Sequence, residues 1–298
     1  MIVSINPTYF CNFRCDFCYL TEQQLGDPKT IDFPKLDELL GQVPDIEWVD
    51  LYGGEIGTMR PEVFYEMKKV IRKHYKGDIN IITNLSMVQD YFLDPDISLG
   101  VSFDFEAREK ADRVFMNMFS VPKNMSVLIL ASPKVLEMDV GKMIDRLNSI
   151  NRVTSVEIKP YSINQANAHN VTHKQFEEFV KKWFDYERNF AFINEYNIQD
   201  SLSKEYDAFS DDHVYITPNG KFSVLEFDKD DKEYFLELDS YDDYIKWTEK
   251  EKLENVSDIC RNCKYFGHCL TEHYRYVKDL DNSCNGYKGL LDWYEAGL

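Results

Sequence analysis

Seven cysteines fall into two groups near the two ends of the chain, a distribution typical of metal-ligand clusters and not of a disulfide framework. The first group, Cys11, Cys15 and Cys18, places three thiols in one short segment. Three thiolates can hold a cube-shaped iron–sulfur cluster and leave one iron open to another molecule, as catalytic metal sites keep an open position. A zinc ion completed by a distant histidine, or free thiols, are the alternatives.

The second group has the pattern C-x2-C-x5-C-x14-C, formed by Cys260, Cys263, Cys269 and Cys284. Four thiolates can close a metal site completely, which suits a structural or electron-transfer role. A zinc knuckle is the alternative that this spacing leaves open.

Composition narrows the class of protein. The 298 residues, 44% of them hydrophobic, suffice for one large domain, or for one of about 200 residues and a smaller one. The net charge of −18, from 34 Lys and Arg against 52 Asp and Glu, disfavours nucleic-acid binding. There is neither a signal-peptide pattern nor a long apolar run, so we expect no membrane association. Together with the grouped cysteines, this predicts a cytoplasmic, reduced location.

The first half of the chain must position the first cysteines. Six short apolar runs typical of buried strands alternate with helical or loop segments, which predicts a parallel sheet with right-handed crossovers. Six strands are fewer than a full eight-stranded barrel needs. The expected strands are 2–6, 48–52, 79–83, 97–103, 125–131 and 154–160. The clearest helices between them are 32–43, with Asp32 as N-cap, 60–75 and 139–150.

The pattern changes after residue 172. Residues 172–192 predict one long amphipathic helix, with Thr172 as its N-cap. Residues 213–227 predict a hairpin around Asn219–Gly220, and residues 241–253 a charged helix. These patterns predict a parallel α/β domain over 1–172, a bridging helical segment over 173–211, and a small antiparallel α+β domain over 212–298.

Polar motifs follow three of the predicted strands. Gly53, Gly54 and Glu55 follow the second strand, Asn84 follows the third, and Ser102 and Asp104 lie at the end of the fourth. The carboxyl ends of parallel strands meet at one edge, where such sheets place active sites. Glycines there let a ligand approach the backbone, and a carboxylate can pair with an ammonium group. Strand-end capping or an ordinary turn is the alternative for each motif.

The C-x3-C-x2-C spacing, with Phe17 before the last cysteine and Gly-Gly-Glu after the second strand, resembles the signature of the radical S-adenosylmethionine enzymes. The resemblance implies a partial (β/α)6 barrel and a [4Fe–4S] cluster whose open iron binds S-adenosylmethionine. In that family the cluster cleaves this cofactor to a 5′-deoxyadenosyl radical, which takes a hydrogen atom from substrate. The cofactor-binding residues it implies are Phe17 and Tyr19 at the adenine, Gly53, Gly54 and Glu55 at the methionine group, Asn84, and Ser102 and Asp104 at the ribose.

The second cysteine group after a hairpin resembles the SPASM extension of radical S-adenosylmethionine peptide maturases, which usually carries two auxiliary clusters. This chain departs from that pattern. His273 stands where a further cysteine is expected, and Leu225 stands where the hairpin cysteine is expected. The resemblance therefore implies a shortened, twitch-like domain with one auxiliary [4Fe–4S] cluster on four cysteines. A packed or solvated His273 is favoured, and a role as ligand stays open.

Two clusters with three and four cysteine ligands use all seven cysteines. No thiol is left to return a hydrogen atom to a substrate radical, which disfavours a peptide epimerase. An oxidative outcome, a cross-link or a dehydrogenation, is favoured, with an electron leaving through the auxiliary cluster. No catalytic acid or base is identified by the sequence.

The leading hypothesis is an enzyme that oxidatively modifies, and in particular cross-links, a ribosomally synthesised peptide. Its expected partners are that peptide and a reductant such as flavodoxin or ferredoxin. Because Cys11 lies close to the N-terminus, a separate leader-peptide recognition protein, or direct binding by the barrel and the acidic surface, would replace an N-terminal winged-helix module. A dehydrogenase of a small molecule and a non-catalytic metal-binding protein are the remaining alternatives.

Overall fold

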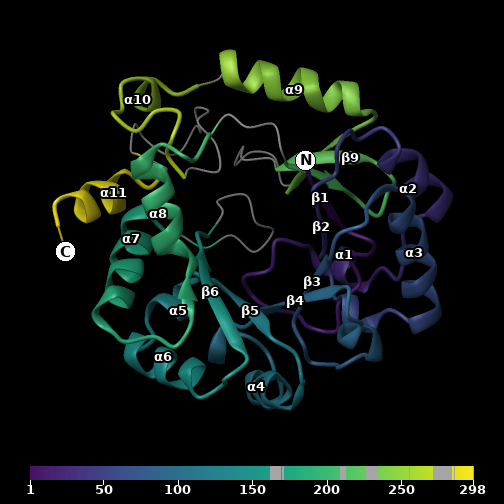
Figure 1. Ribbon diagram of the computed structural model, residues 1–298, viewed down its shortest axis with the longest axis horizontal. Helices are drawn as coiled ribbons and strands as arrows, with labels where there is room; N and C mark the ends of the chain where they lie inside the picture. Colours follow the sequence, from purple (N-terminus) through teal and green to yellow (C-terminus); the bar gives the residue numbers. More distant parts are fainter. Residues whose placement is uncertain are drawn as a thin grey trace.

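The computed structural model describes residues 1–161, 169, 171–208, 213–225, 234–254, 256–270, 284 and 286–297. Its framework is a ten-stranded sheet with the strand order β10-β9-β8-β1-β2-β3-β4-β5-β6-β7. Figure 1 shows the sheet curving through the molecule with most helices on its outer side. No helix in these residues is long and apolar enough to cross a membrane.

The six strands predicted in the first half of the chain are confirmed, and each pairs in parallel with its neighbour. They are β1 (Ile2–Ile5), β2 (Trp48–Leu51), β3 (Ile79–Thr83), β4 (Ile97–Ser102), β5 (Met125–Leu130) and β6 (Val153–Lys159). The helices between them are α1 (Glu22–Gly26), α2 (Phe33–Leu40), α3 (Pro61–His74), α4 (Ala111–Ser120), α5 (Pro133–Leu136) and α6 (Val140–Asn148), with short 3-10 turns η1 (Ile56–Thr58), η2 (Asp90–Leu93) and η3 (Phe105–Ala107).

Local chemistry explains where the longer helices begin. The Asp32 carboxylate accepts the backbone N–H of Lys35 at 2.9 Å and so caps α2 as predicted. Helix α3 begins at Pro61, whose fixed φ suits a first helical position. Its face with Phe64, Met67 and Ile71 is fully buried, which fixes α3 against the sheet.

Strands β1 to β3 have one mainly apolar face, whereas the other face mixes polar residues with Ile2, Trp48 and Ile82. One face is fully buried against the helices and consists of Val3, Ile5, Val49, Leu51, Ile79 and Ile81. The intervening residues Ser4, Asp50 and Asn80 point to the other face. The concave side of the curved sheet therefore carries polar side chains, although parallel strands are usually apolar on both faces.

The long helix predicted over 172–192 is wrong in its second half. Helix α7 spans His173–Lys182 and passes into the 3-10 turn η4 (Trp183–Asp185). The chain then forms the short strand β7 (Ala191–Phe192) on β6, followed by α8 (Ile193–Ser203). Arg188 donates to the carbonyl of Trp183 at 2.8 Å, and Asn148 accepts the backbone N–H of Asn189 at 2.9 Å. The bond to Asn148 is tertiary, whereas the bond between Arg188 and Trp183 spans only five residues. Together they hold the backbone in a non-helical path after α7.

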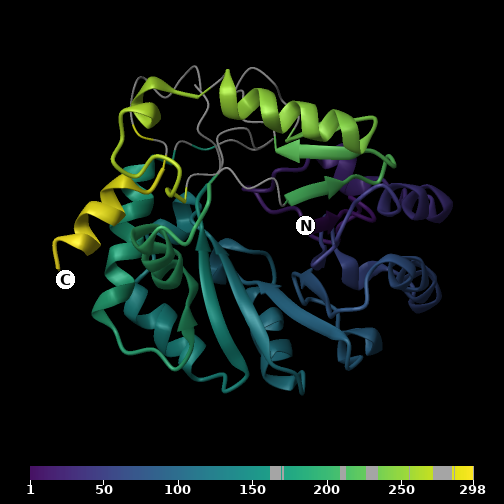
Figure 2. The ribbon, with the colours of Figure 1, turned by 45° about the horizontal axis from the view of Figure 1, so that its top comes forward.

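The C-terminal part contains β8 (His213–Ile216), β9 (Phe222–Leu225), β10 (Phe235–Leu238), α9 (Tyr241–Leu253), α10 (Asp258–Arg261) and α11 (Lys288–Glu295). The predicted hairpin is confirmed: Gly220, with φ of +73°, donates to the Thr217 carbonyl at 3.0 Å. Strand β8 also pairs in parallel with β1, so this part extends the main sheet. Figure 2 shows α9 and the hairpin at that end of the sheet.

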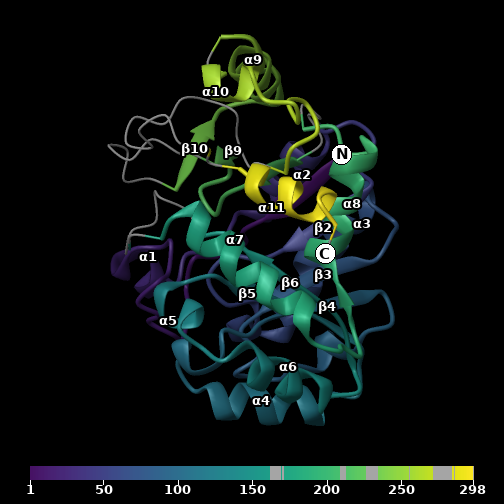
Figure 3. The same cartoon turned by 90° about the vertical axis from the view of Figure 1, so that its left-hand side faces the viewer.

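Helix α11 packs on the helices that precede the hairpin. Glu177 on α7 accepts the backbone N–H of Gly289 at 2.9 Å, and Gln199 on α8 donates to the hydroxyl of Tyr294 at 2.8 Å. Figure 3 shows α11 beside α7 and α8. The chain end is thus fixed to the segment that follows the first six strands.

Candidate functional site

A cavity of about 370 Å³ lies at the carboxyl ends of the parallel strands. The cysteine loop, the strand ends and the hairpin all contribute to its wall. The residues predicted from the sequence that line it are Cys11, Cys15, Cys18, Phe17, Tyr19, Gly53, Gly54, Asn84, Ser102 and Asp104. Glu55, also predicted, is buried behind this wall. One cavity therefore brings together side chains from four separate segments.

The cysteine loop is held against the Gly-Gly-Glu turn by backbone hydrogen bonds. Gly54 donates to the Thr8 carbonyl at 3.0 Å, and Glu55 donates to the Phe10 carbonyl at 2.8 Å. A Cβ at position 54 would lie only 2.1 Å from the Phe10 oxygen. Glycine is therefore required at position 54 because two backbone segments pass closely there.

The three thiols of the loop lie in an apolar setting that still supplies N–H donors. Burial raises the pKa of Cys11 to about 12, and burial also raises the pKa values of Cys15 and Cys18. The backbone N–H of Phe13 donates to the Cys11 sulfur at 3.4 Å, and that of Leu20 donates to the Cys18 sulfur at the same distance. Such hydrogen bonds stabilise metal-bound thiolates, whose protons are displaced when metal binds.

Glu55 and Asn84 connect the ends of β2 and β3 to the cysteine loop. The Glu55 carboxylate accepts the Thr83 hydroxyl at 2.5 Å and the backbone N–H groups of Gly57 and Asn84 at 2.6 Å. Burial raises the pKa of Glu55, while these donors oppose that change. The Asn84 amide donates to the Asn12 side chain at 3.0 Å. Both residues thus position the loop, whatever else they contact.

Asp104 is fully buried and is engaged by protein donors. Its carboxylate accepts Nε of Arg108 at 2.8 Å, Nη2 of Arg108 at 2.5 Å and the backbone N–H of Leu130 at 2.6 Å. Arg108 also places Nη1 3.9 Å from the Cys15 sulfur and lies 5.3 Å from the ring centre of Phe17. Sequence reasoning missed Arg108, because no motif marks an arginine on the irregular segment after β4.

The C-terminal part contributes an aromatic wall that the sequence did not predict, with Tyr215 on β8 and Tyr234 directly before β10. Tyr234 lies 4.4 Å from Tyr19 between ring centres, and Tyr215 on β8 lies 6.3 Å from Tyr52. The Tyr19 hydroxyl donates to the Gly53 carbonyl at 3.3 Å, and burial raises the pKa of Tyr19 well above its usual value. The C-terminal part therefore completes the cavity that the first half of the chain begins.

Asn6, directly after β1, is another residue that sequence reasoning missed. It is fully buried, and neither its side-chain oxygen nor its nitrogen has a hydrogen-bond partner within the part of the chain that the structure describes. A Cβ on Gly53 would lie 3.0 Å from its oxygen. Buried amides are normally satisfied, so a water or a bound molecule beside the Gly-Gly-Glu turn would satisfy it.

The second cysteine group comes together in the C-terminal part. Burial raises the pKa of Cys260 to about 11, and the neighbouring thiols of Cys284 and Cys263 add to this effect. The backbone N–H of Tyr287 donates to the Cys269 sulfur at 3.4 Å, which brings this cysteine next to the segment that carries Cys284. His273 lies outside the described residues.

The arrangement of the two cysteine groups bears on the kind of metal centre that each could hold. Within the described ranges, no three Cys, His, Asp or Glu side chains converge on the position of a single metal ion. A four-iron cluster does not require such convergence, because each thiolate binds a different iron. The gathered thiols, buried or half-buried and supplied with N–H donors, fit a cluster at each group.

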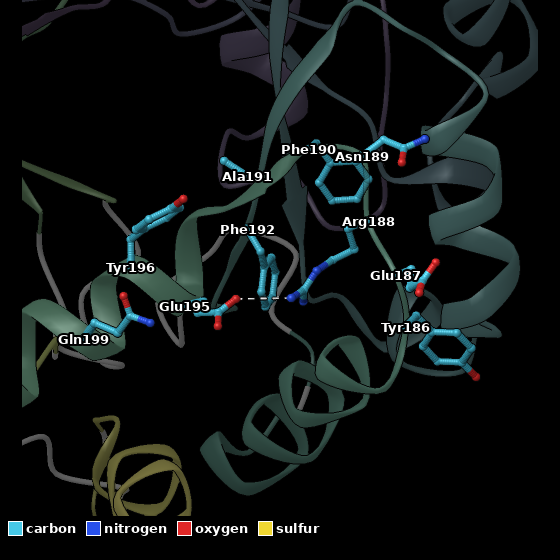
Figure 4. Close-up of a pocket in the computed structure, with 10 residues that line it drawn as sticks. All are labelled: Tyr186, Glu187, Arg188, Asn189, Phe190, Ala191, Phe192, Glu195, Tyr196 and Gln199. Atoms are coloured by element: carbon cyan, nitrogen blue, oxygen red, sulfur yellow. Dashed lines mark hydrogen bonds and ion pairs between the residues drawn. The ribbon is translucent and has the colours of Figure 1, made fainter. Parts of the chain in front are cut away.

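A second cavity, of about 490 Å³, lies along β7 and the start of α8 (Figure 4). Arg188 and Glu195 form an ion pair of 3.1 Å in its wall. Arg188 also lies 4.8 Å from the ring centre of Phe192 and so packs as part of the fold. None of the residues predicted from the sequence as site residues lines this cavity.

No protein-family model matches the sequence. An uncharacterized protein of Archaeoglobus fulgidus is 26% identical over 114 residues, which is 36% of this chain. The match spans about a quarter of that protein's length, 26%.

Solved structures match almost the whole chain. Native anSMEcpe with bound AdoMet has a TM-score of 0.74 at 14% identity, covering 98% of this chain and 94% of that one. Native anSMEcpe with AdoMet and the Cp18Cys peptide has a TM-score of 0.72 at 13% identity, with the same coverage. SuiB of Streptococcus suis bound to the precursor peptide SuiA has a TM-score of 0.64 at 15% identity, covering 93% and 74%. The predicted fold class is confirmed, and this chain has the α/β fold of anSMEcpe and SuiB.

Proposed function

We propose that this chain is a radical S-adenosylmethionine enzyme that oxidatively modifies a ribosomally synthesised peptide. One observation carries the proposal: the three cysteines of the loop, the glycines of the Gly-Gly-Glu turn and polar strand-end residues converge on one cavity. The chain also shares its fold with anSMEcpe, which is solved with bound AdoMet. When bound, the cluster and S-adenosylmethionine would supply a 5′-deoxyadenosyl radical that takes a hydrogen atom from substrate.

The chain's own residues would do the following. Cys11, Cys15 and Cys18 would hold one cluster and leave an iron open, and Gly53 and Gly54 would let S-adenosylmethionine approach the backbone. The residues proposed to contact this cofactor are Phe17, Tyr19, Gly53, Gly54, Glu55, Asn84, Ser102 and Asp104. Asp104 already pairs with Arg108, so its contact with a ribose would use the remaining capacity of its carboxylate.

The second cluster would be held by Cys260, Cys263, Cys269 and Cys284 and would accept an electron. No cysteine is left for hydrogen return, which supports an oxidation and disfavours an epimerisation. A peptide substrate is supported by two proteins of the same fold, anSMEcpe solved with the Cp18Cys peptide and SuiB solved with SuiA. A flavodoxin or ferredoxin would supply the reducing electron.

Anaerobic reconstitution tests the cofactor content. We expect about eight irons and eight sulfides per chain, two four-iron clusters, and formation of 5′-deoxyadenosine with a reductant. The matched control is a variant with Cys11, Cys15 and Cys18 replaced by alanine, which should keep about four irons and form no 5′-deoxyadenosine. Two zinc ions per chain and no cleavage would refute the enzyme hypothesis.

The substrate is tested separately. Peptides encoded beside the gene are incubated with the reconstituted enzyme and analysed by tandem mass spectrometry. Loss of two hydrogens at a defined position supports oxidative modification, whereas unchanged mass with inverted stereochemistry would indicate an epimerase. Turnover of a small alcohol and of none of the peptides would indicate a small-molecule dehydrogenase.

A further inference from the structure

A carboxylate, a hydroxyl and an imidazole form a chain on the concave face of three adjacent strands. Asp50 on β2, Ser4 on β1 and His213 on β8 line the same cavity as the three cysteines. The strand register explains their proximity, because Ser4 is paired with Asp50 on one side and with Tyr215 on the other.

The two oxygens of Asp50 have different surroundings. Oδ1 accepts the indole N–H of Trp48 and the side-chain amide of Asn80, both at 2.8 Å. Oδ2 has only a long contact of 3.4 Å from the Ser4 hydroxyl within the described part of the chain. The donors on Oδ1 therefore fix the carboxylate, while Oδ2 keeps the capacity to accept a proton.

Ser4 and His213 continue from this carboxylate toward solvent. The Ser4 hydroxyl is 3% exposed and lies 2.8 Å from Nε2 of His213. His213 is exposed, and its ring stacks on Tyr215 at 4.5 Å between centres. A hydroxyl can accept one proton while it donates another, and histidine exchanges protons with water near neutral pH.

Strand geometry separates the hydrogen-bonded side chains Asp50, Ser4 and His213 from the edge of the sheet at which the cofactor is proposed to bind. Asp50 precedes Gly53 by three residues, which corresponds to roughly 10 Å along an extended strand. A substrate that occupies the cavity between the Gly-Gly-Glu turn and Asp50 would therefore have the cysteine loop on one side and Oδ2 on the other.

We propose that Asp50 accepts the proton that the substrate loses during its oxidation, and that Ser4 and His213 pass it to solvent. This inference rests on the proposed function. With S-adenosylmethionine and both clusters bound, the proposed radical chemistry would remove one hydrogen atom from a substrate carbon. Completing the oxidation would then release one electron, to the auxiliary iron–sulfur cluster, and one proton, to Asp50, so that a new bond or double bond forms with net loss of two hydrogens. Asp50 is the catalytic residue. Ser4 and His213 position its carboxylate and carry the proton away from it.

The main test is Asp50→Asn, which keeps the size of the side chain and an oxygen that can accept from Trp48 and Asn80. Hydrogen abstraction precedes proton loss, so 5′-deoxyadenosine should form within about twofold of the wild-type amount. The ratio of oxidised product to 5′-deoxyadenosine should fall at least about tenfold, since a general base contributes about 100-fold or more. In deuterium oxide, recovered substrate should carry deuterium. A substrate radical that cannot lose its proton would instead take an electron from the reductant and a deuteron from solvent.

The matched control is Asp112→Asn, an aspartate on α4 whose side chain is fully exposed. It should leave both the product ratio and deuterium incorporation unchanged. A wild-type product ratio in Asp50→Asn would overturn the relay. Absence of 5′-deoxyadenosine from the wild-type enzyme would instead overturn the proposed function.

A second readout does not depend on turnover. Nitrogen NMR of the histidine rings should show a shifted Nε2 resonance of His213 in Ser4→Ala and an unchanged one in Asp112→Asn. An unchanged His213 resonance in Ser4→Ala would contradict the proposed hydrogen-bonded relay from Ser4 to His213. If Asp50→Asn does not fold, the product ratios of Ser4→Ala and His213→Gln decide, with a decrease expected in both and wild-type ratios overturning the proposal.

Discussion

Arg108 and Asp104 show how a single pair of charges supports the candidate site. Asp104 is fully buried, and Arg108 engages it through two nitrogens while it reaches toward the Cys15 sulfur. The carboxylate raises the pKa of Arg108 and keeps a permanent positive charge beside the cysteine loop. This charge would offset part of the negative charge of three thiolates.

Replacing Arg108 with methionine should destabilise the protein strongly. It removes the partner of a buried carboxylate, and an uncompensated buried charge costs about 3–5 kcal/mol. Urea unfolding followed by circular dichroism measures the free energy of unfolding. Lys134→Met is the control, since Lys134 pairs with Asp16 at 2.5 Å on the surface and such a pair contributes about 1 kcal/mol or less. Equal losses in both variants would argue against a special role for the buried pair.

At the scale of elements, the cysteine loop depends on the turn that follows β2. Gly54 lies against the backbone of the loop, where a Cβ would meet the Tyr9 oxygen at 2.4 Å as well as that of Phe10. The loop cannot move away without losing the hydrogen bonds to Thr8 and Phe10. The turn and the loop therefore form one unit.

Gly54→Ala should consequently reduce iron binding at the first cysteine group. We expect about four irons per reconstituted chain and not about eight, because only the second four-iron site stays intact. Gly26→Ala is the matched control, since a Cβ at that position has no atom within 4 Å. Iron analysis and thermal unfolding of both variants provide the measurement. Full iron content in Gly54→Ala would show that the loop tolerates the displacement.

His173, the first residue of helix α7, makes the stability of the folded protein depend on pH. Burial lowers the pKa of His173 from 6.5 to about 4. Between these values the unfolded chain binds a proton and the folded chain does not, so stability falls as pH decreases from about 6.5 to about 4. When the pH is lowered from about 7.5 to about 4.5, the unfolding free energy of His173→Gln should fall by about 2 kcal/mol less than that of the wild type. Urea unfolding at both pH values tests this, and an identical loss in the two proteins would contradict it.

The elements differ in how well the sequence predicted them. The strands β1 to β6 were predicted because Val3, Ile5, Val49 and their equivalents form short apolar runs that tolerate full burial. The helix predicted over 172–192 is too long, because the backbone N–H of Asn189 is bound by the distant Asn148, a contact that no local pattern reveals. Cys11 and Gly53 could be singled out from local spacing, whereas the surroundings of Asp50 and Arg108 depend on contacts with residues distant in the sequence.

At the scale of the whole molecule, the C-terminal part and the first strand share hydrogen bonds. Strand β8 pairs with β1 over residues 2–5, and the C-terminal part supplies Tyr215 and Tyr234 to the cavity wall. Helix α11 is bound to α7 and α8 through Glu177 and Gln199. The change of pattern predicts a separate domain over 212–298, and this division stays a prediction. The pairing of β8 with β1 across that boundary cannot be read from a pattern.

Fragments separated at the predicted boundaries test this continuity. We expect the fragment 212–298 to be largely unfolded, because β8 would lose its pairing with β1 and α11 would lose its contacts with α7 and α8. The fragment 1–172 should aggregate, since the unpaired edge of β1 would expose a row of backbone N–H and C=O groups. Circular dichroism and proton–nitrogen NMR of each fragment, compared with the intact chain, provide the measurement. A dispersed spectrum for either fragment would show that it is an independent domain. Recovery of the intact spectrum only after both fragments are joined to residues 173–211 would show that one continuous sheet holds the cysteine loop and the aromatic wall together.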